Sequence, residues 1–202
     1  MSRGERLLQQ RYGTTKRASS FYENQMVDFL NERMIQFIGE QSMVFIATAD
    51  DKGNCDSSFR AGIPGFVRVL DNRTLIYPEY RGNGVLASLG NIIENPHIGL
   101  MFIDFLEKKV GLHVNGKARI IGNNQLAAEL QISRTLLGDI VEKEGSKPER
   151  WVVVKVEEAY IHCSKHIPKM KKVDSTIDWG SDDEVAKGGD FFHVKQEKKQ
   201  PK

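Results

Sequence analysis

The chain has 202 residues, 40% of them hydrophobic, which suits one domain with a single core and polar tails. Its 29 basic and 27 acidic residues leave a formal net charge of +2, so no charge excess indicates nucleic acid or a membrane surface as a partner. Two cysteines are too few for a disulfide framework. The polar start MSRGERLLQQRYG and the absence of long apolar runs predict a cytoplasmic protein without a membrane span.

The N-terminal part is predicted to contain an arm, a helix and a strand. Residues 1–20 are polar and basic without a core-forming pattern, so we interpret them as an arm. Residues 22–41 carry apolar side chains at helical spacing, which predicts one helix. The apolar run at 42–49 is typical of a strand, and the segment DDKGN after it is typical of a tight turn.

The centre of the chain predicts a hairpin that leads into a glycine-containing loop and a helix. Residues 66–70 and 74–77 are short apolar runs on either side of the polar triplet DNR, as in a β-hairpin. The loop PEYRGNG follows, and two glycines there allow unusual backbone dihedrals. Apolar residues from Val85 to Ile93 then recur at helical spacing, and Pro96 ends the pattern.

This order of elements is suited to binding a phosphate group. The first N–H groups of the helix, its positive dipole end and Arg81 can all face one anion. Arg60 offers a second guanidinium, while Ser57, Ser58 and Ser88 offer hydroxyls. Neither GxxxxGK[ST] nor GxGxxG is present, which excludes the usual nucleotide fingerprints. An ordinary turn with a surface arginine is the alternative.

The remaining elements favour a mainly antiparallel sheet. Residues 97–104 read as a buried strand, and residues 111–121 alternate between an apolar face and a polar face that contains His113, Asn115, Lys117 and Arg119. The polar face is either solvated, as is common in antiparallel sheets, or meets a subunit or a cofactor. Residues 124–137 predict a helix, 138–150 a polar connection and 151–161 the last strand. About six strands joined by short turns favour a barrel with added helices over βαβ units.

Four segments carry a resemblance to a known family: SSFRAGIPGFVRVLDNRTLIYPEYRGNG, ASLGNIIENPHIGLMFID, GLHVNGKARI and VEEAYIHCSKHIPK. They resemble the pyridoxamine 5'-phosphate oxidase-like proteins, and most closely an uncharacterised bacterial branch. The resemblance implies a mainly β (α+β) fold, a six-stranded split β-barrel with flanking helices. It also implies a homodimer that holds FMN in clefts between the subunits and acts on a small molecule. The domain would span 21–169, followed by a partly ordered tail at 170–202.

Carrying the family pattern over to this chain gives a provisional cofactor site. Its members are Ser57, Ser58, Arg60, Tyr77, Pro78, Tyr80, Arg81, Asn83, Gly84, Ser88 and Lys165. The resemblance implies that the arginine on the early strand meets the phosphate and that backbone groups at Tyr77 and Pro78 border the flavin ring. Lys165 follows the last strand and is a candidate to offset phosphate or substrate charge.

The chain departs from the vitamin B6 oxidases of this family at two places. Ser88 stands where those enzymes have a phosphate-binding lysine, and Trp179 has no matching arginine downstream. This favours flavin binding without vitamin B6 oxidase activity. A reductase that uses a deazaflavin, or a protein that binds flavin or haem without turnover, remain alternatives within the same fold.

Two further features leave the catalytic residues unassigned. The segment HCSKH offers Cys163 between two histidines, but no second cluster completes a zinc site, so no metal is expected. No nucleophile elbow is present either, and a flavin needs no protein nucleophile because the cofactor carries the electrons. In the tail, Trp179, Phe191 and Phe192 predict partial ordering against a partner subunit.

Overall fold

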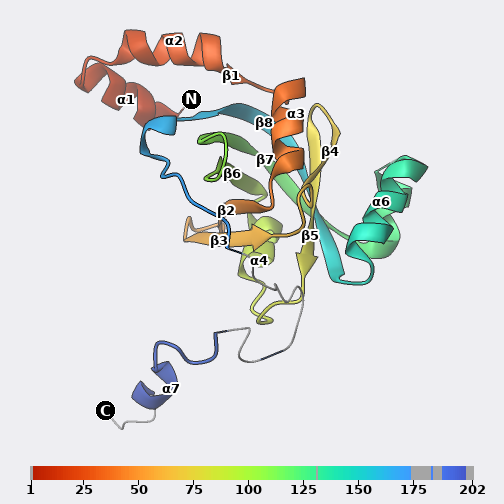
Figure 1. Ribbon diagram of the computed structural model, residues 1–202. Coiled ribbons are helices and arrows are strands. Elements are labelled where there is room, and N and C mark those ends of the chain that lie inside the picture. Colours follow the sequence, from red (N-terminus) through yellow and green to blue (C-terminus); the bar gives the residue numbers. More distant parts are fainter. Residues whose placement is uncertain (1, 131, 174–182, 184–187, 199–202) are drawn as a thin grey trace.

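The computed structural model describes residues 2–130, 132–173, 183 and 188–198. These residues contain one sheet of eight strands in the order β3-β2-β6-β7-β8-β5-β4, with β1 paired to β8 beside this path (Figure 1). Every pairing is antiparallel. Six of the strands have seven or more residues, and two short ones, β1 and β4, add to them. The predicted split-barrel fold with flanking helices is confirmed.

The strands are β1 (Met26–Val27), β2 (Met43–Ala49), β3 (Cys55–Ala61), β4 (Arg68–Asp71), β5 (Thr74–Tyr80), β6 (His97–Asp104), β7 (Val110–Gly122) and β8 (Pro148–His162). The α-helices are α1 (Arg3–Arg11), α2 (Thr15–Gln25), α3 (Glu32–Glu40), α4 (Ala87–Glu94), α5 (Leu126–Glu129), α6 (Arg134–Glu144) and α7 (Val194–Glu197). The 3-10 turns are η1 (Asn123–Gln125) and η2 (Ser164–His166). Both predicted hairpin turns, after β2 and after β4, are confirmed.

Alternation along the strands separates an inner face from an outer face. The inner face holds the main core, in which Val44, Leu100, Val114 and Val154 are buried beneath helices α3 and α4. A second apolar cluster lies where α5 and α6 cover the sheet, and Trp151 and Ile140 belong to it. Its members come from strands and helices that are far apart in the chain, so α6 is held against β5, β7 and β8.

The outer face of the sheet carries a row of large side chains in cross-strand register. The row runs Phe59, Phe45, Met101, His113 and Tyr160 across β3, β2, β6, β7 and β8. Phe59 and Phe45 are in ring contact at 5.4 Å, and the His113 imidazole stacks on Tyr160 at 4.7 Å. Phe21 of α2 covers the Tyr160 end of the row, whereas half of the Phe59 side chain is exposed at the other end.

The structure corrects the sequence predictions in the N-terminal part. The predicted helix at 22–41 is wrong, because Met26 and Val27 form β1 against Tyr160 and Ala159 of β8. A separate helix, α3, starts after Asn31, whose side chain accepts the Met34 N–H at 3.0 Å. Residues predicted as an unpatterned arm form α1 and most of α2, whose side chains are exposed or half-buried. The apolar residues keep helical spacing across 22–41, although the chain leaves the helix between α2 and α3.

A second correction concerns the segment before the last strand. The single helix predicted at 124–137 is wrong, since a short α5 ends at Glu129 and α6 begins after Ser133. The Ser133 hydroxyl accepts the Leu136 N–H at 3.2 Å, which is the usual role of an N-cap. Residues predicted as a polar connection form the second half of α6, which ends at Gly145 with a positive φ of 59°.

The tail prediction is tested only in part. Trp179 lies outside the described residues. Phe191 and Phe192 are exposed and pack edge-on against each other at 5.2 Å, so within this one copy they do not join the core.

The closest backbone approach in the sheet gives a stability prediction. Gly116 lies at a β-bulge between β7 and β8, and a Cβ atom there would meet the Lys155 carbonyl oxygen at 2.0 Å. We expect Gly116→Ala to lower the free energy of unfolding by about 3 kcal/mol, because that contact is with backbone. Chemical denaturation measures the change. Gly90→Ala in α4 is the control, since no atom lies within 4 Å of its added Cβ. Equal stability of the two variants would contradict the assigned packing.

Candidate functional site

The barrel is open between β3 and β5, and a charged pair bridges the opening. β3 pairs with β2 along one edge, while β4 covers β5 only as far as Ile76. In the described part of the chain no strand pairs with residues 77–80 on that edge, so their backbone groups face the opening. The Arg60 guanidinium of β3 reaches across and donates from Nε to Glu79 Oε1 of β5 at 3.0 Å. We call this opening the seam.

A continuous chain of polar side chains follows the seam. Because strand side chains alternate, Asp56, Ser58 and Arg60 project from the same face of β3. Arg60 Nη1 donates to Ser58 Oγ at 2.9 Å, and Ser58 Oγ lies 3.0 Å from Ser88 Oγ of α4. The Ser88 hydroxyl donates to Asp56 Oδ2 at 2.7 Å. These hydrogen bonds therefore join β3 and β5 to α4.

The Arg60 charge is already compensated. Glu79 is only 7% exposed, and burial raises the pKa of its carboxyl group, while Arg60 and Arg150 act in the opposite direction. The Arg60 side chain is itself 22% exposed. A partly buried pair of this kind fixes the geometry of both groups but adds little net positive charge. Arg60 is thus a less available phosphate ligand than the sequence alone implies.

The start of α4 provides donors that no side chain of the described protein uses. Leu86 precedes the helix in the left-handed region, with φ of 58°, and offers no capping oxygen. The first backbone N–H groups of α4 therefore lack an intrahelical acceptor. Gly84, at φ of 80°, and Asn83, whose Oδ1 accepts the Val85 N–H at 3.0 Å, shape the loop before the helix. Arg81 is exposed on the same loop.

The structure brings some of the predicted site residues together and separates others. Ser58, Arg60 and Ser88 are in direct contact. Ser57 projects from the opposite face of β3 and is exposed, so it does not join them. Lys165 is exposed on η2, and no contact of its side chain with the seam is found among the described residues. Side chains alternate between the two faces of a strand, so the neighbours Ser57 and Ser58 point in opposite directions.

Two carboxylates of the site were missed by reasoning from sequence. Asp56 and Glu79 lie at the two ends of the polar chain, two residues from Ser58 and from Tyr77 respectively. Alternation along β3 places Asp56 on the Ser58 face and was a usable signal. Glu79 gave no such signal, because its partner Arg60 is distant in sequence.

The two tyrosines at the end of β5 have different surroundings. Tyr77 is fully buried, and its hydroxyl has no hydrogen-bond partner in the described structure. Burial raises the pKa of this phenol. The Tyr80 hydroxyl donates to Glu144 Oε2 of α6 at 2.6 Å. The Tyr80 ring therefore contacts α6, whereas Tyr77 lies in the core on the same face of β5 as Glu79.

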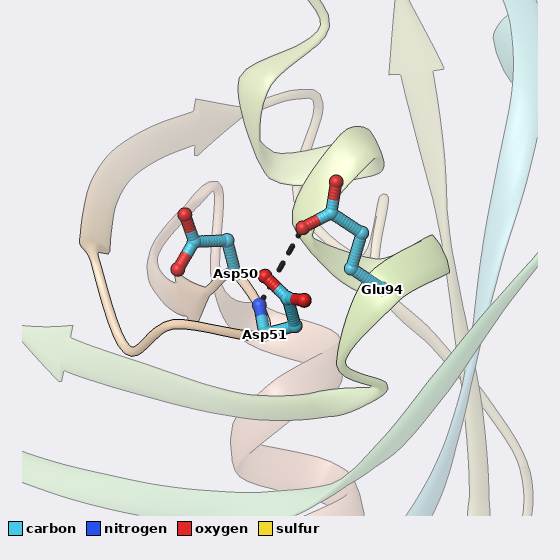
Figure 2. A group of neighbouring side chains, drawn as sticks. All are labelled: Asp50, Asp51 and Glu94. Atoms are coloured by element: carbon cyan, nitrogen blue, oxygen red, sulfur yellow. Dashed lines mark hydrogen bonds between the residues drawn. The ribbon is translucent and has the colours of Figure 1, made fainter.

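Three neighbouring carboxylates lie near the other end of α4. Asp50, Asp51 and Glu94 bring their oxygens close together (Figure 2). Asp50 already accepts hydrogen bonds from the Lys52 N–H and from the backbone and side chain of Asn54, which lower its pKa. The Asp51 N–H donates to Glu94 at 3.5 Å. This group closes the β2–β3 turn and joins it to α4.

The histidines of β7 and β8 form a separate pair on the outer face. His113 Nε2 lies 2.9 Å from His162 Nδ1, within hydrogen-bonding distance. Burial, followed by the nearby His162, lowers the pKa of His113. Cys163 and His166 are exposed beyond the strand end.

Two hollows of the described structure lie away from the seam. One of about 440 Å³ lies between β4, β5, β7, β8 and α5, and another of about 370 Å³ lies between α3 and the β6–β7 turn. Neither is lined by Ser58, Arg60 or Ser88. Neither hollow is therefore part of the candidate site.

Comparison with known proteins places this architecture in a family. The family model described as pyridoxamine 5'-phosphate oxidase matches residues 30–163, which span β2 to β8 and all of the seam. The chain belongs to the pyridoxamine 5'-phosphate oxidase family. A search of curated proteins finds no match to the chain.

Several solved structures are similar to this chain. HupZ from Group A Streptococcus is 24% identical, covers 65% of this chain and 93% of its own, and has a TM-score of 0.49. A putative pyridoxamine 5'-phosphate oxidase from Lactobacillus delbrueckii is 21% identical, with coverages of 66% and 95% and a TM-score of 0.47. HutZ, the haem storage protein from Vibrio cholerae, is 16% identical, with coverages of 65% and 94% and a TM-score of 0.43. No helix among the described residues is long and apolar enough to cross a membrane.

The histidine pair predicts a pH dependence of stability. Since the folded state lowers the pKa of His113, the unfolded chain binds more protons at mildly acidic pH, and stability is lost as the pH falls below about 6.5. We expect thermal melts between pH 7.5 and pH 5.5 to show a smaller loss for His113→Gln than for the unmodified protein. His166→Gln, at an exposed position, is the control. An unchanged pH profile in His113→Gln would contradict this role.

Proposed function

We propose that this protein is a cytoplasmic homodimer that binds FMN at the seam and uses it to oxidise or reduce a small molecule. The observation that carries the proposal is the uncapped start of α4 beside the Ser88–Ser58–Arg60 chain, at the open edge of a pyridoxamine 5'-phosphate oxidase family barrel. Helix N-termini with neighbouring hydroxyl and guanidinium groups are suited to phosphate. The open backbone edge at residues 77–80 offers hydrogen-bonding groups for a flat ring.

The charges of the seam decide which groups hold the phosphate. Asp56 and Glu79 offset Arg60, so the polar chain alone has one net negative charge and does not attract a dianion. The first N–H groups of α4 and Arg81, on the loop before the helix, favour negative charge. The phosphate would therefore rest on the α4 side, held by these groups rather than by Ser88, whose one hydroxyl proton is donated to Asp56. Arg60 would then orient Ser58 rather than bind the anion itself.

The bound flavin would supply the redox chemistry, since its ring system accepts and donates electrons. The residues of this chain would bind and orient the cofactor. Backbone groups at Tyr77 and Pro78 would fix the ring at the strand edge, and Lys165 would reach a site only if a second copy brings it there. Ser88 donates to Asp56, so a neutral, committed hydroxyl stands where vitamin B6 oxidases have a lysine. This argues against vitamin B6 phosphates as the substrate.

Two observations support a second copy as part of the site. In one copy the strand edges at the seam are unpaired, whereas cofactor sites usually bury most of their ligand. The outer row next to it ends in Phe59, an exposed aromatic side chain on the strand that carries Arg60. A twofold-related copy packed on this row would bury Phe59 and wall the seam. A deazaflavin cofactor, or haem bound without turnover, would keep the fold and is the alternative.

The phosphate assignment is tested by titrating FMN with fluorescence quenching as the readout. We expect Arg81→Ala to weaken FMN affinity by about 2 kcal/mol, roughly thirtyfold, because a charge-assisted contact is lost. Arg73→Ala is the matched control, since Arg73 lies at the opposite end of β5 and pairs with Asp28. If both variants bind FMN as tightly as the unmodified protein, the phosphate is not held by this loop.

Assembly is tested by light scattering. We expect the unmodified protein to have the mass of a dimer at micromolar concentration, and Phe59→Glu to have the mass of a monomer, because a carboxylate would be placed in an apolar interface. Val173→Glu, which adds the same charge at another exposed apolar position, is the control and should stay dimeric. A monomeric unmodified protein that still binds FMN would exclude a cleft built from two copies.

A further inference from the structure

A buried network of charged groups lies behind the loop that precedes α4. Arg68, the first residue of β4, donates from Nη1 to Glu144 Oε1 of α6 at 2.9 Å and to the Phe66 carbonyl at 3.0 Å. Its Nε lies 3.3 Å from Asp139 Oδ2, and its guanidinium lies over the Trp151 ring at 5.9 Å. The side chains of Arg68 and Glu144 are 4% and 2% exposed. This is the most deeply buried ion pair of the described structure.

The network connects α6 to the end of β5. Glu144 uses its second oxygen, Oε2, to accept the Tyr80 hydroxyl at 2.6 Å. Tyr80 is the last residue of β5, and residue 81 begins the loop that leads to α4. The β5–β8 register shifts between Glu79 and Tyr80, and Tyr80, opposite Pro148, is the last residue of β5 in the ladder. The phenol contact with Glu144 therefore adds a constraint at the end of the strand, where the ladder stops.

The energetics indicate a geometric role for these groups. Taking Arg68 and Glu144 out of water is costly. Well-packed apolar residues of similar volume often stabilise a fold at least as much as a buried ion pair does. The network is also incompletely satisfied, because Arg68 Nη2 is buried without a hydrogen-bond partner in the described structure. An apolar alternative would have no such unpaired donor, but it would not fix the direction of the Tyr80 hydroxyl. What the charged network adds is a defined position for Tyr80.

We propose that Glu144 is a positioning residue which, through Tyr80, holds the 81–86 loop and the start of α4 in the arrangement that receives an anion. Asp139 and Arg68 hold Glu144 in place, and the apolar contacts of Ile140 and Trp151 hold α6 against the sheet. Docking of α6 and ligand binding at the seam are thereby coupled. Tyr80, predicted from sequence to bind the cofactor, acts through its loop instead. The part of this proposal that concerns FMN rests on the proposed function, whereas the part that concerns the loop does not.

The test is Tyr80→Phe, which removes one hydroxyl and leaves the Arg68–Glu144 pair and the ring in place. Tyr22→Phe is the matched control. It removes a hydroxyl on α2 that accepts a hydrogen bond from Gln9 of α1 at 2.8 Å. Amide hydrogen exchange of the full-length protein is followed by mass spectrometry for peptides that cover residues 81–95 and 97–122. FMN affinity of the three proteins is measured in parallel.

We expect Tyr80→Phe to exchange several-fold faster in 81–95 with no change in 97–122, and to bind FMN about fivefold more weakly, because the competent loop is less populated. Tyr22→Phe should match the unmodified protein in both measurements. Unchanged exchange in 81–95, or faster exchange spread equally over both peptides, would overturn the positioning role. If the unmodified protein binds no FMN, the proposed function fails, and the exchange data still decide the loop claim.

Discussion

The pairing of Arg60 with Glu79 is the interaction on which the candidate site depends. It joins the two strand edges that the sheet leaves unpaired, and it fixes Arg60 so that Ser58 and Ser88 come within hydrogen-bonding distance. Because the pair is partly buried, its charges stabilise each other more than they attract ligands. The site therefore consists of a polar strand edge beside a helix start that is suited to an anion.

This view changes the roles of the arginines. From sequence, Arg60 and Arg81 are equivalent candidates for a phosphate. In the structure, Arg60 has a buried carboxylate partner, whereas Arg81 lies on the loop before an uncapped helix. The buried Arg68 belongs to neither role and connects α6 to the loop through Glu144 and Tyr80. Arg60 therefore orients Ser58, Arg68 connects α6 to the loop, and Arg81 is the arginine proposed to contact the phosphate.

The strands were predictable because their signals are local. Apolar runs, alternation and polar turns located β2 and β4 to β8 within a few residues, and the break at Pro96 located the end of α4. The helix predicted across Met26 was wrong because β1 is formed by pairing with the distant Tyr160. Glu79 and Glu144 were missed for the same reason, since their partners Arg60 and Arg68 are far away in sequence. Contacts between segments that are distant in sequence determine both the β1 strand and the positions of these two glutamates.

The central claim is that the seam holds a flavin nucleotide through its phosphate. The most direct test is the absorption spectrum of the purified protein, combined with the mass of the compound released on denaturation. We expect a flavin spectrum and the mass of FMN, either as purified or after incubation with FMN and removal of the excess. A haem spectrum, the mass of a deazaflavin, or a colourless protein that does not retain added FMN would contradict it.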